Sequence, residues 1–230
     1  MQILSQAPLE TPATGVARPW LLHGAGLAGE RGERGLFEHL DIQLAAGSIT
    51  WLRGRNGRGK TSLLRMLAGL SSLQAGVVHI AGQTLRQGGP AWRGQWLYIG
   101  HQNALKDDLT AAEALRFLAQ VHGTPATDAQ VAAALRAMGV QQGQHAPVRT
   151  LSQGQKRRVA LARLLLSAAS PLWLLDEPFD ALDADGITAL NTVLAEHAAR
   201  GGCVLLTSHQ APSLSHPVPA VLDLDLYACA

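Results

Sequence analysis

The sequence predicts an α/β fold in which helices cover a mainly parallel β-sheet that has an antiparallel β edge and an inserted helical subdomain. From about residue 36 onward, short apolar runs alternate with helical segments, which is typical of strands that alternate with helices. A glycine-rich loop at 54–61 lies between a strand-like run and a helix-like run. Residues 104–168 read mostly as helix and separate this loop from a later strand that ends in two carboxylates.

The length and composition are those of one folded domain. The chain has 230 residues, of which 47% are hydrophobic, and this is enough to bury a sizeable core. We expect residues 18–230 to form a single domain, with the helical subdomain at about 104–168 inserted in it. Residues 1–17 are expected to be a flexible tail, because their apolar residues are scattered among prolines.

Charge and hydropathy exclude several classes of function. The formal net charge of +2 comes from dispersed residues and does not predict a nucleic-acid-binding surface. No stretch approaches the roughly 20 apolar residues that span a bilayer, and no secretory signal is recognisable. Any contact with a membrane is therefore expected to pass through a partner. Cys203 and Cys229 are expected to be reduced thiols rather than a disulfide.

The individual strands are predicted from short apolar runs. Six are expected in chain order at 48–53, 77–80, 96–99, 172–175, 203–207 and 220–222, with a helix at 62–68. Later helices begin with capping-box patterns, in which a hydroxyl residue is followed three positions later by Glu or Gln. These pairs are Thr110 with Glu113, Thr127 with Gln130, and Ser152 with Gln155. Linkers at 87–90 and 139–147 are expected to border the parts of the helical subdomain.

The glycine-rich loop predicts a nucleoside triphosphate site of the P-loop NTPase type. Its glycines allow consecutive N–H groups to converge on phosphate oxygens, and the following helix directs its positive end to the same point. Lys60 would reach the β- and γ-phosphates, and the Thr61 hydroxyl could ligate Mg²⁺. The expected phosphate-binding residues are Gly54, Arg55, Asn56, Gly57, Arg58, Gly59, Lys60, Thr61 and Ser62.

A strand at 172–175 ends in the adjacent carboxylates Asp176 and Glu177, at the sheet edge where open α/β folds bind ligands. Asp176 is placed to hold Mg²⁺, and Glu177 to polarise the attacking water as general base. A solvated acidic turn is the alternative interpretation. At 151–155, Leu-Ser-Gln-Gly-Gln opens a helix and offers a second phosphate-binding edge, although the segment alone would pass for an ordinary capped helix.

Together these segments resemble the nucleotide-binding subunits of ABC transporters, over about residues 36–209. The resemblance implies a head-to-tail homodimer that closes on two ATP molecules. The signature residues Ser152, Gln153, Gly154 and Gln155 would face the γ-phosphate bound by the partner subunit, and Asp183 would communicate across the dimer. The resemblance also implies catalytic roles for Glu177, Gln102 and His209, with Mg²⁺ bound by Thr61, Gln102 and Asp176.

A narrower resemblance is to the CcmA family, the ATP-binding subunits of the haem exporter of cytochrome c maturation. It depends on the runs at 60–65, 98–106, 155–164, 171–179 and 208–210, including the tryptophan before the acidic strand end. It implies a CcmB-like integral membrane subunit as partner and a peripheral position at the cytoplasmic face of the bacterial inner membrane. A different ABC importer or exporter is the first alternative. A soluble ABC protein acting on nucleic acid or ribosomes is the second.

Some residues depart from these patterns. Gln153 stands where the family has a small residue, Arg55 and Arg58 make the loop unusually cationic, and no aromatic ring near residue 29 is available to stack on adenine. Trp20 is the nearest large ring. The G-x-G-x-x-G string at 24–29 predicts a bend in an early strand or loop rather than a dinucleotide site. The basic run at 156–158 is interpreted as a solvated helix face. Four histidines are expected to be surface or structural: His101, His122, His145 and His197.

Overall fold

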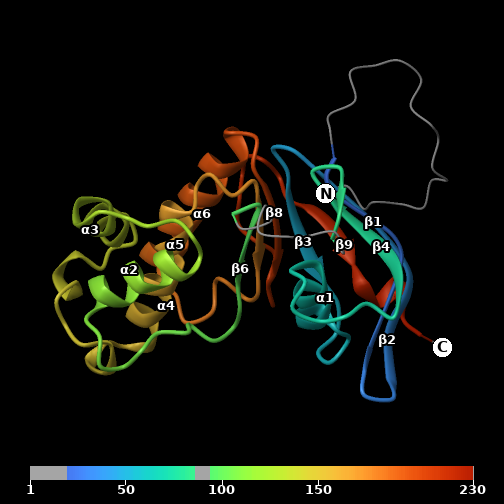
Figure 1. The fold of residues 1–230 in the computed structure, drawn as a ribbon, viewed down its shortest axis with the longest axis horizontal. Helices are drawn as coiled ribbons and strands as arrows, with labels where there is room; N and C mark the ends of the chain where they lie inside the picture. Colours follow the sequence, from blue (N-terminus) through green and yellow to red (C-terminus); the bar gives the residue numbers. More distant parts are fainter. Residues whose placement is uncertain (1–19, 86–93, 230) are drawn as a thin grey trace.

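The computed structural model describes residues 20–85 and 94–229, which form two β-sheets and the helices that cover them (Figure 1). The predicted tail at 1–17 and the linker at 87–90 lie outside the described residues. Within the described residues, no helix is long and apolar enough to cross a membrane. Cys203 and Cys229 are both free thiols.

The central sheet has five strands, which all run parallel. Its order is β6-β7-β8-β3-β9. The strands are β3 (Ile49–Arg53), β6 (Trp96–Ile99), β7 (Leu172–Leu175), β8 (Cys203–Thr207) and β9 (Ala220–Asp223). All five correspond to predicted runs, and β6, β7 and β8 match them residue for residue. The mainly parallel core predicted from the sequence is therefore confirmed.

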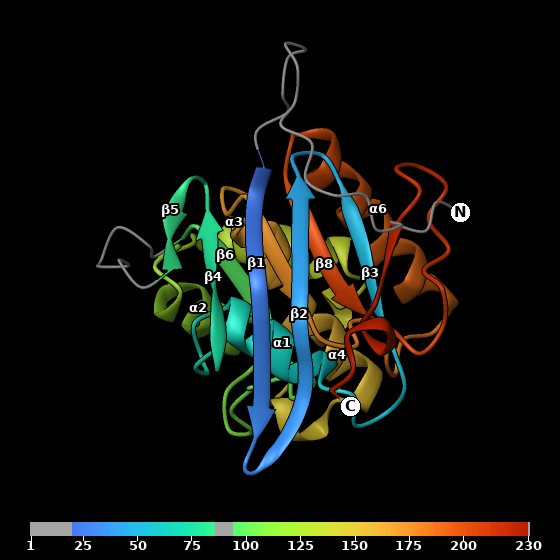
Figure 2. The same cartoon turned by 90° about the vertical axis from the view of Figure 1, so that its right-hand side faces the viewer.

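A second, antiparallel sheet of order β2-β1-β4-β5 forms the other side of the molecule (Figure 2). It contains β1 (Trp20–Arg31), β2 (Arg34–Ala45), β4 (Ala75–Ile80) and β5 (Gln83–Thr84). Only β4 was predicted individually. The string at 24–29 lies in β1, where the pairing with β2 shifts register between Gly24 and Leu27 and again before Gly29. A bent early strand, and not a dinucleotide loop, is confirmed.

Helices pack on both faces of the parallel sheet. Helix α1 (Lys60–Leu67) shares a core with the antiparallel sheet and with Leu172, Leu174 and Leu205. The alternate residues Trp173, Leu175 and Leu206 point into a second core, as the two-residue period of a strand requires. That second core is built with α2 (Ala111–Val121), α3 (Asp128–Ala137), α4 (Gln153–Leu161), α5 (Arg163–Leu166) and α6 (Ala184–Ala199). Figure 1 shows α2–α5 gathered at one end of the molecule.

Short 3₁₀ turns and helix caps complete the fold. The turns are η3 (Gln141–Gly143), η4 (Val148–Thr150) and η5 (Leu224–Tyr227). All three predicted capping boxes are present, with both reciprocal hydrogen bonds, at the starts of α2, α3 and α4. Helices thus fill much of the chain between β6 and β7, as the sequence predicted.

Candidate functional site

The phosphate loop connects β3 to α1 in a conformation that requires glycine. Gly57 and Gly59 have φ angles of 77° and 104°, a region that other residues enter only with strain. Gly59 caps α1 without a side-chain hydrogen bond, and the first turn of α1 carries no acidic residue. The positive end of this helix is therefore open to an anion. The Lys60 ammonium donates to the carbonyl oxygens of Gly54 at 2.7 Å and Arg55 at 3.3 Å, and so closes the loop on itself.

The charge of Arg55 and Arg58 is partly balanced by a residue far along the chain. Asp225, in η5, accepts a hydrogen bond from the backbone N–H of Arg55 at 3.1 Å. Its other oxygen pairs with Arg58 Nε at 2.9 Å. The cationic loop expected from the sequence therefore has an acidic partner in the structure. Asp225 is distant in sequence and carries no local motif, so the sequence gives no signal for this contact.

Two hard oxygen ligands lie next to each other beside the loop. Thr61 Oγ1 donates to the Asp176 carboxylate, at 2.9 Å from Oδ2 and 3.1 Å from Oδ1. Thr207 Oγ1, at the end of β8, donates to Asp176 Oδ1 at 2.9 Å. Asp176 is 2% exposed, so these hydroxyls fix its orientation. Hydroxyl and carboxylate oxygens are the ligands that Mg²⁺ prefers, and this pair therefore fits that ion.

Glu177 has an unusual backbone conformation. Its φ angle is 48°, which is uncommon for a residue with a Cβ and is concentrated at functional sites. Partial burial is the main reason that the pKa of the Glu177 carboxyl is raised. The charges of His209 and, more weakly, Lys60 lower this pKa, whereas the charges of Asp180 and Asp176 raise it further. A carboxylate with a raised pKa is better matched to proton transfer near neutral pH.

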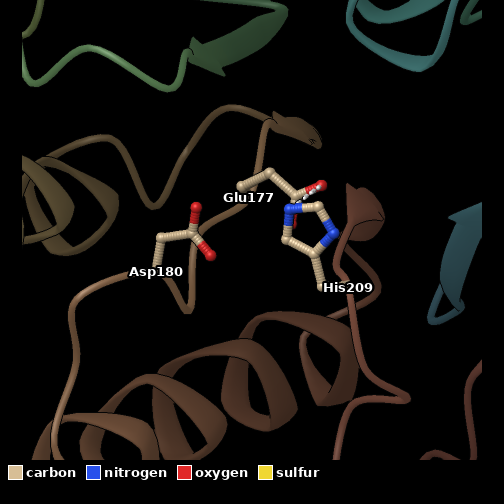
Figure 3. Close-up of side chains that lie close together, drawn as sticks. All are labelled: Glu177, Asp180 and His209. Carbon is tan, nitrogen blue, oxygen red and sulfur yellow. Dashed lines mark ion pairs between the residues drawn. The ribbon is translucent and has the colours of Figure 1, made fainter. Parts of the chain in front are cut away.

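His209 and Asp180 lie on either side of Glu177 (Figure 3). His209 Nε2 is 3.9 Å from Glu177 Oε1, and one side-chain ligand atom from each of the three residues lies within 4.8 Å of the others. Asp180 also approaches His101, with 3.7 Å between Oδ2 and Nδ1. The sequence predicted His209 but no role for Asp180, which lies three residues after Glu177 without a motif of its own.

The predicted solvated face at 156–158 is wrong. Arg157 is only 3% exposed, and its guanidinium donates to backbone carbonyls at the ends of β6 and β7. Arg158 forms an ion pair with Asp183, and its side chain is 12% exposed. Lys156 Nζ lies 3.6 Å from Asp107. In the sequence, three consecutive basic residues look like a solvent-exposed segment. Only the tertiary contacts show that each of the three side chains has different surroundings.

The remaining predicted residues are not joined to the phosphate loop by any hydrogen bond within 20–85 and 94–229. Ser152, Gln153 and Gln155 are exposed at the start of α4, which packs on the sheet face opposite α1. Gln102 is exposed in the bend that follows β6. Asp183 caps α6 by accepting the N–H of Gly186 at 2.9 Å, and this hydrogen bond is the main reason that its pKa is lowered.

Trp20 lies at the start of β1, away from any predicted motif. It is 49% exposed and lines a shallow pocket of about 340 Å³ with His23, His79 and Gly82. His23 and His79 face each other across β1 and β4, with ring centroids 6.2 Å apart.

Comparison with known proteins agrees with this arrangement. The sequence profile described as ABC transporter matches residues 37–180, which include the phosphate loop, the signature segment and the acidic strand end. A putative ABC transporter ATP-binding protein from Pyrococcus furiosus has the same fold, with a TM-score of 0.77 at 22% identity over 90% of this chain and 99% of that one. A solved ATP-binding subunit of an ABC transporter has a TM-score of 0.73 at 29% identity, covering 83% and 80% of the two chains. The fold and the loop thus define an ATP-binding domain of the ABC transporter class.

Relatives with higher sequence identity show which family of ABC transporter proteins the chain resembles. The cytochrome c biogenesis ATP-binding export protein CcmA of Pseudomonas putida is 50% identical over 188 residues, which are 82% of this chain and 89% of that protein. CcmA of Aromatoleum aromaticum is 43% identical over 204 residues, 89% and 95% of the two chains. The chain belongs to the CcmA family of ABC transporter ATP-binding proteins.

Proposed function

We propose that this chain is the ATP-hydrolysing subunit of an export complex of cytochrome c biogenesis, and that it drives a separate membrane subunit. One observation carries the proposal: Thr61 of the phosphate loop is hydrogen-bonded to Asp176, next to Glu177 with its raised pKa. The loop at 54–61 thus lies beside Asp176 and Glu177 at one edge of the sheet, which supports a triphosphate site there. The printed function of the relatives, a cytochrome c biogenesis ATP-binding export protein, supports the choice of complex.

ATP would bind with its phosphates on the N–H groups of 54–61, within reach of Lys60. On binding, the Lys60 ammonium exchanges its two carbonyl partners for phosphate oxygens. Thr61 and Asp176 would hold Mg²⁺ together with Gln102, and the ion would neutralise charge on the phosphates. Ser62, the second residue of α1, would donate at the same helix end.

Glu177 would then act as general base. Its carboxylate accepts a proton from water while the water oxygen attacks the γ-phosphorus; the bond to the β–γ bridging oxygen breaks, and ADP and phosphate form. His209, with Nε2 3.9 Å from Glu177 Oε1, would contact the γ-phosphate. Asp180 contributes to the raised pKa of the base.

Two copies would assemble head to tail. The exposed start of α4, with Ser152, Gln153, Gly154 and Gln155, packs on the sheet face opposite α1, which favours its presentation to ATP on another subunit. Asp183 follows the turn that leaves Glu177 and would relay the state of one site to the other. A CcmB-like membrane subunit would contact the helical subdomain and the loop at Gln102, at the cytoplasmic face of a bacterial inner membrane.

The test of the base assignment is steady-state ATP turnover of Glu177→Gln. Gln keeps the size of the side chain but cannot accept the proton, so turnover should fall on the order of 10²-fold or more. Glu196→Gln is the matched control, because Glu196 is an exposed acid on α6 that pairs with Arg200. Near-normal turnover by Glu177→Gln would remove Glu177 from this role.

A further inference from the structure

Both polar groups of the Glu177 backbone, the N–H and the carbonyl, form hydrogen bonds with side chains of other residues. Its N–H donates to Thr207 Oγ1 at 2.8 Å, and its carbonyl oxygen accepts from Arg157 Nη2 at 2.7 Å. A left-handed residue with a Cβ costs about 1–2 kcal/mol and persists only where its surroundings impose it. The Cα–Cβ direction follows from the backbone, so these two contacts fix the direction in which the Glu177 side chain leaves the turn.

Arg157 also joins three parts of the site. From α4, its guanidinium reaches Gly100 O at 3.0 Å, Asn103 Oδ1 at 3.2 Å and Asp176 O at 2.9 Å, in addition to Glu177 O. The bend that carries Gln102 is thereby connected to the end of β7. A planar guanidinium with several fixed donors suits this bridging role, and a lysine has only one nitrogen to offer.

Burial of the Arg157 guanidinium in these surroundings costs free energy. Within the described parts of the chain, Arg157 has no carboxylate partner at ion-pair distance, and its charge faces carbonyl and amide oxygens instead. Burial lowers the pKa of Arg157, while the nearby charges of Asp180, Asp176 and Glu177 oppose this. A buried charge persists only where hydrogen bonds satisfy it, and here the acceptors include the carbonyls of Asp176 and Glu177 in the turn that carries the proposed base. The arrangement therefore points to a role in the chemistry of the site.

We propose that Arg157 is a positioning residue for Glu177 and links the signature helix α4 to the general base of the same subunit. The proposal rests on the proposed function, since it assumes that Glu177 is the base. Arg157 lies two residues after Gln155, so a change at the start of α4 is transmitted to the carbonyl of Glu177 through a single side chain. Capture of ATP by the signature segment of one site would then adjust the base of the other.

The test compares Arg157→Lys and Arg157→Gln in the full-length protein. Turnover is measured as a function of ATP concentration, and folding is followed by thermal melting. Arg163→Lys is the matched control: Arg163 is a second partly buried arginine, six residues further along, whose pKa burial also lowers. Within the described residues it has no hydrogen bond to the turn after β7.

We expect kcat of Arg157→Gln to fall on the order of 10²-fold with little change in KM, because displacement of a catalytic group by about 1 Å has that effect. Arg157→Lys should retain part of the activity.

A merely structural role predicts a different result. The melting temperature would fall, but KM, and kcat per folded molecule, would stay at their wild-type values, and this outcome would overturn the proposal. If Arg157→Gln fails to fold, kcat and KM of Arg157→Lys decide alone. Glu177→Gln, measured in parallel, keeps the two proposals apart: an active Glu177→Gln removes the base itself, whereas inactive Glu177→Gln with unaffected Arg157 variants removes only the link.

Discussion

At the scale of single residues, His197 shows how the core constrains protonation. Its ring stacks on Trp173 with centroids 3.6 Å apart and is 1% exposed. A Cβ on Gly202 would lie 2.1 Å from His197 Nε2, so the ring fills the space that this glycine leaves. Burial lowers the pKa of His197 to about 4, although backbone contacts at Pro171 and Cys203 act in the opposite direction. His197 is therefore the structural histidine that the sequence predicted, and it is neutral at pH 7.

This predicts a specific loss of stability in mild acid. An unfolded histidine has a pKa near 6.5, so the unfolded chain binds an extra proton between that pH and about 4. The free energy of unfolding is therefore highest above pH 6.5 and falls as the pH drops through this window, by about 2 kcal/mol at pH 5.

Urea unfolding at pH 7.5 and pH 5 measures the effect. His197→Phe preserves the ring and removes the titration, so its stability should depend less on pH than that of the wild type by about the same 2 kcal/mol. Equal losses in the two proteins would show that His197 is not the responsible group.

Site residues that belong to a local sequence motif were predictable, whereas residues that reach the site only through tertiary contacts were not. Lys60, Thr61 and Asp176 lie in short patterns whose order along the chain places them at one sheet edge. Thr207 and Arg157 act through contacts that span 31 and 20 positions, and neither belongs to a pattern that separates it from an ordinary strand or surface residue. The prediction of a solvated helix face at 156–158 was wrong for the same reason, because the burial of a helix face depends on the elements that pack against it.

At the scale of elements, the helices α2, α3 and α4 each begin with a capping box. Thr110, Thr127 and Ser152 each accept the N–H of the third residue of the helix, whose side chain returns the bond. These caps share the same pair of reciprocal hydrogen bonds and provide controls for each other. Only the cap of α4 belongs to the segment that we propose to contact ATP on a partner subunit. The Ser152 hydroxyl accepts from Gln155 N at 3.1 Å, and among the residues that the structure describes it donates to no other group.

We predict that Thr127→Ala and Ser152→Ala each lower the free energy of unfolding by about 1 kcal/mol. Only Ser152→Ala should also slow ATP turnover, by on the order of 10-fold or more, because it removes a donor from the proposed phosphate site. Denaturant unfolding and turnover at saturating ATP measure the two effects. If the two variants lose stability alike and keep full turnover, the Ser152 hydroxyl serves as a cap and nothing more.

The parallel sheet was easier to predict than the antiparallel one for a physical reason. Strands β7 and β8 are buried on both faces and read as continuous apolar runs. Strands β1 and β2 each have a partly exposed face, contain glycines and charged residues, and pair through repeated register shifts. Their apolar residues therefore do not alternate regularly, and a sequence pattern of period two is obscured.

At the scale of the whole molecule, the parallel sheet divides the chain into two cores. Helix α1 and the phosphate loop belong with the antiparallel sheet, and the signature helix α4 belongs with α2–α6 on the other face. The two segments predicted to bind phosphate lie in the same chain, but the sheet lies between the helices α1 and α4 that carry them. A head-to-tail pair would bring each exposed signature segment to the loop of its partner and so complete two sites at once.

We therefore predict that Glu177→Gln, which would bind ATP without hydrolysing it, becomes a dimer in Mg-ATP and remains a monomer without nucleotide. Each bound triphosphate would bridge two subunits, so its binding energy favours the closed pair. Sedimentation velocity measures the change, and the double variant Lys60→Ala/Glu177→Gln is the control, because loss of the Lys60 ammonium weakens triphosphate binding. If Glu177→Gln stays monomeric at saturating Mg-ATP even with its membrane subunit present, Ser152 and Gly154 cannot act on a partner's nucleotide. The signature segment would then be only a capped helix, as its exposed start on α4 would equally allow.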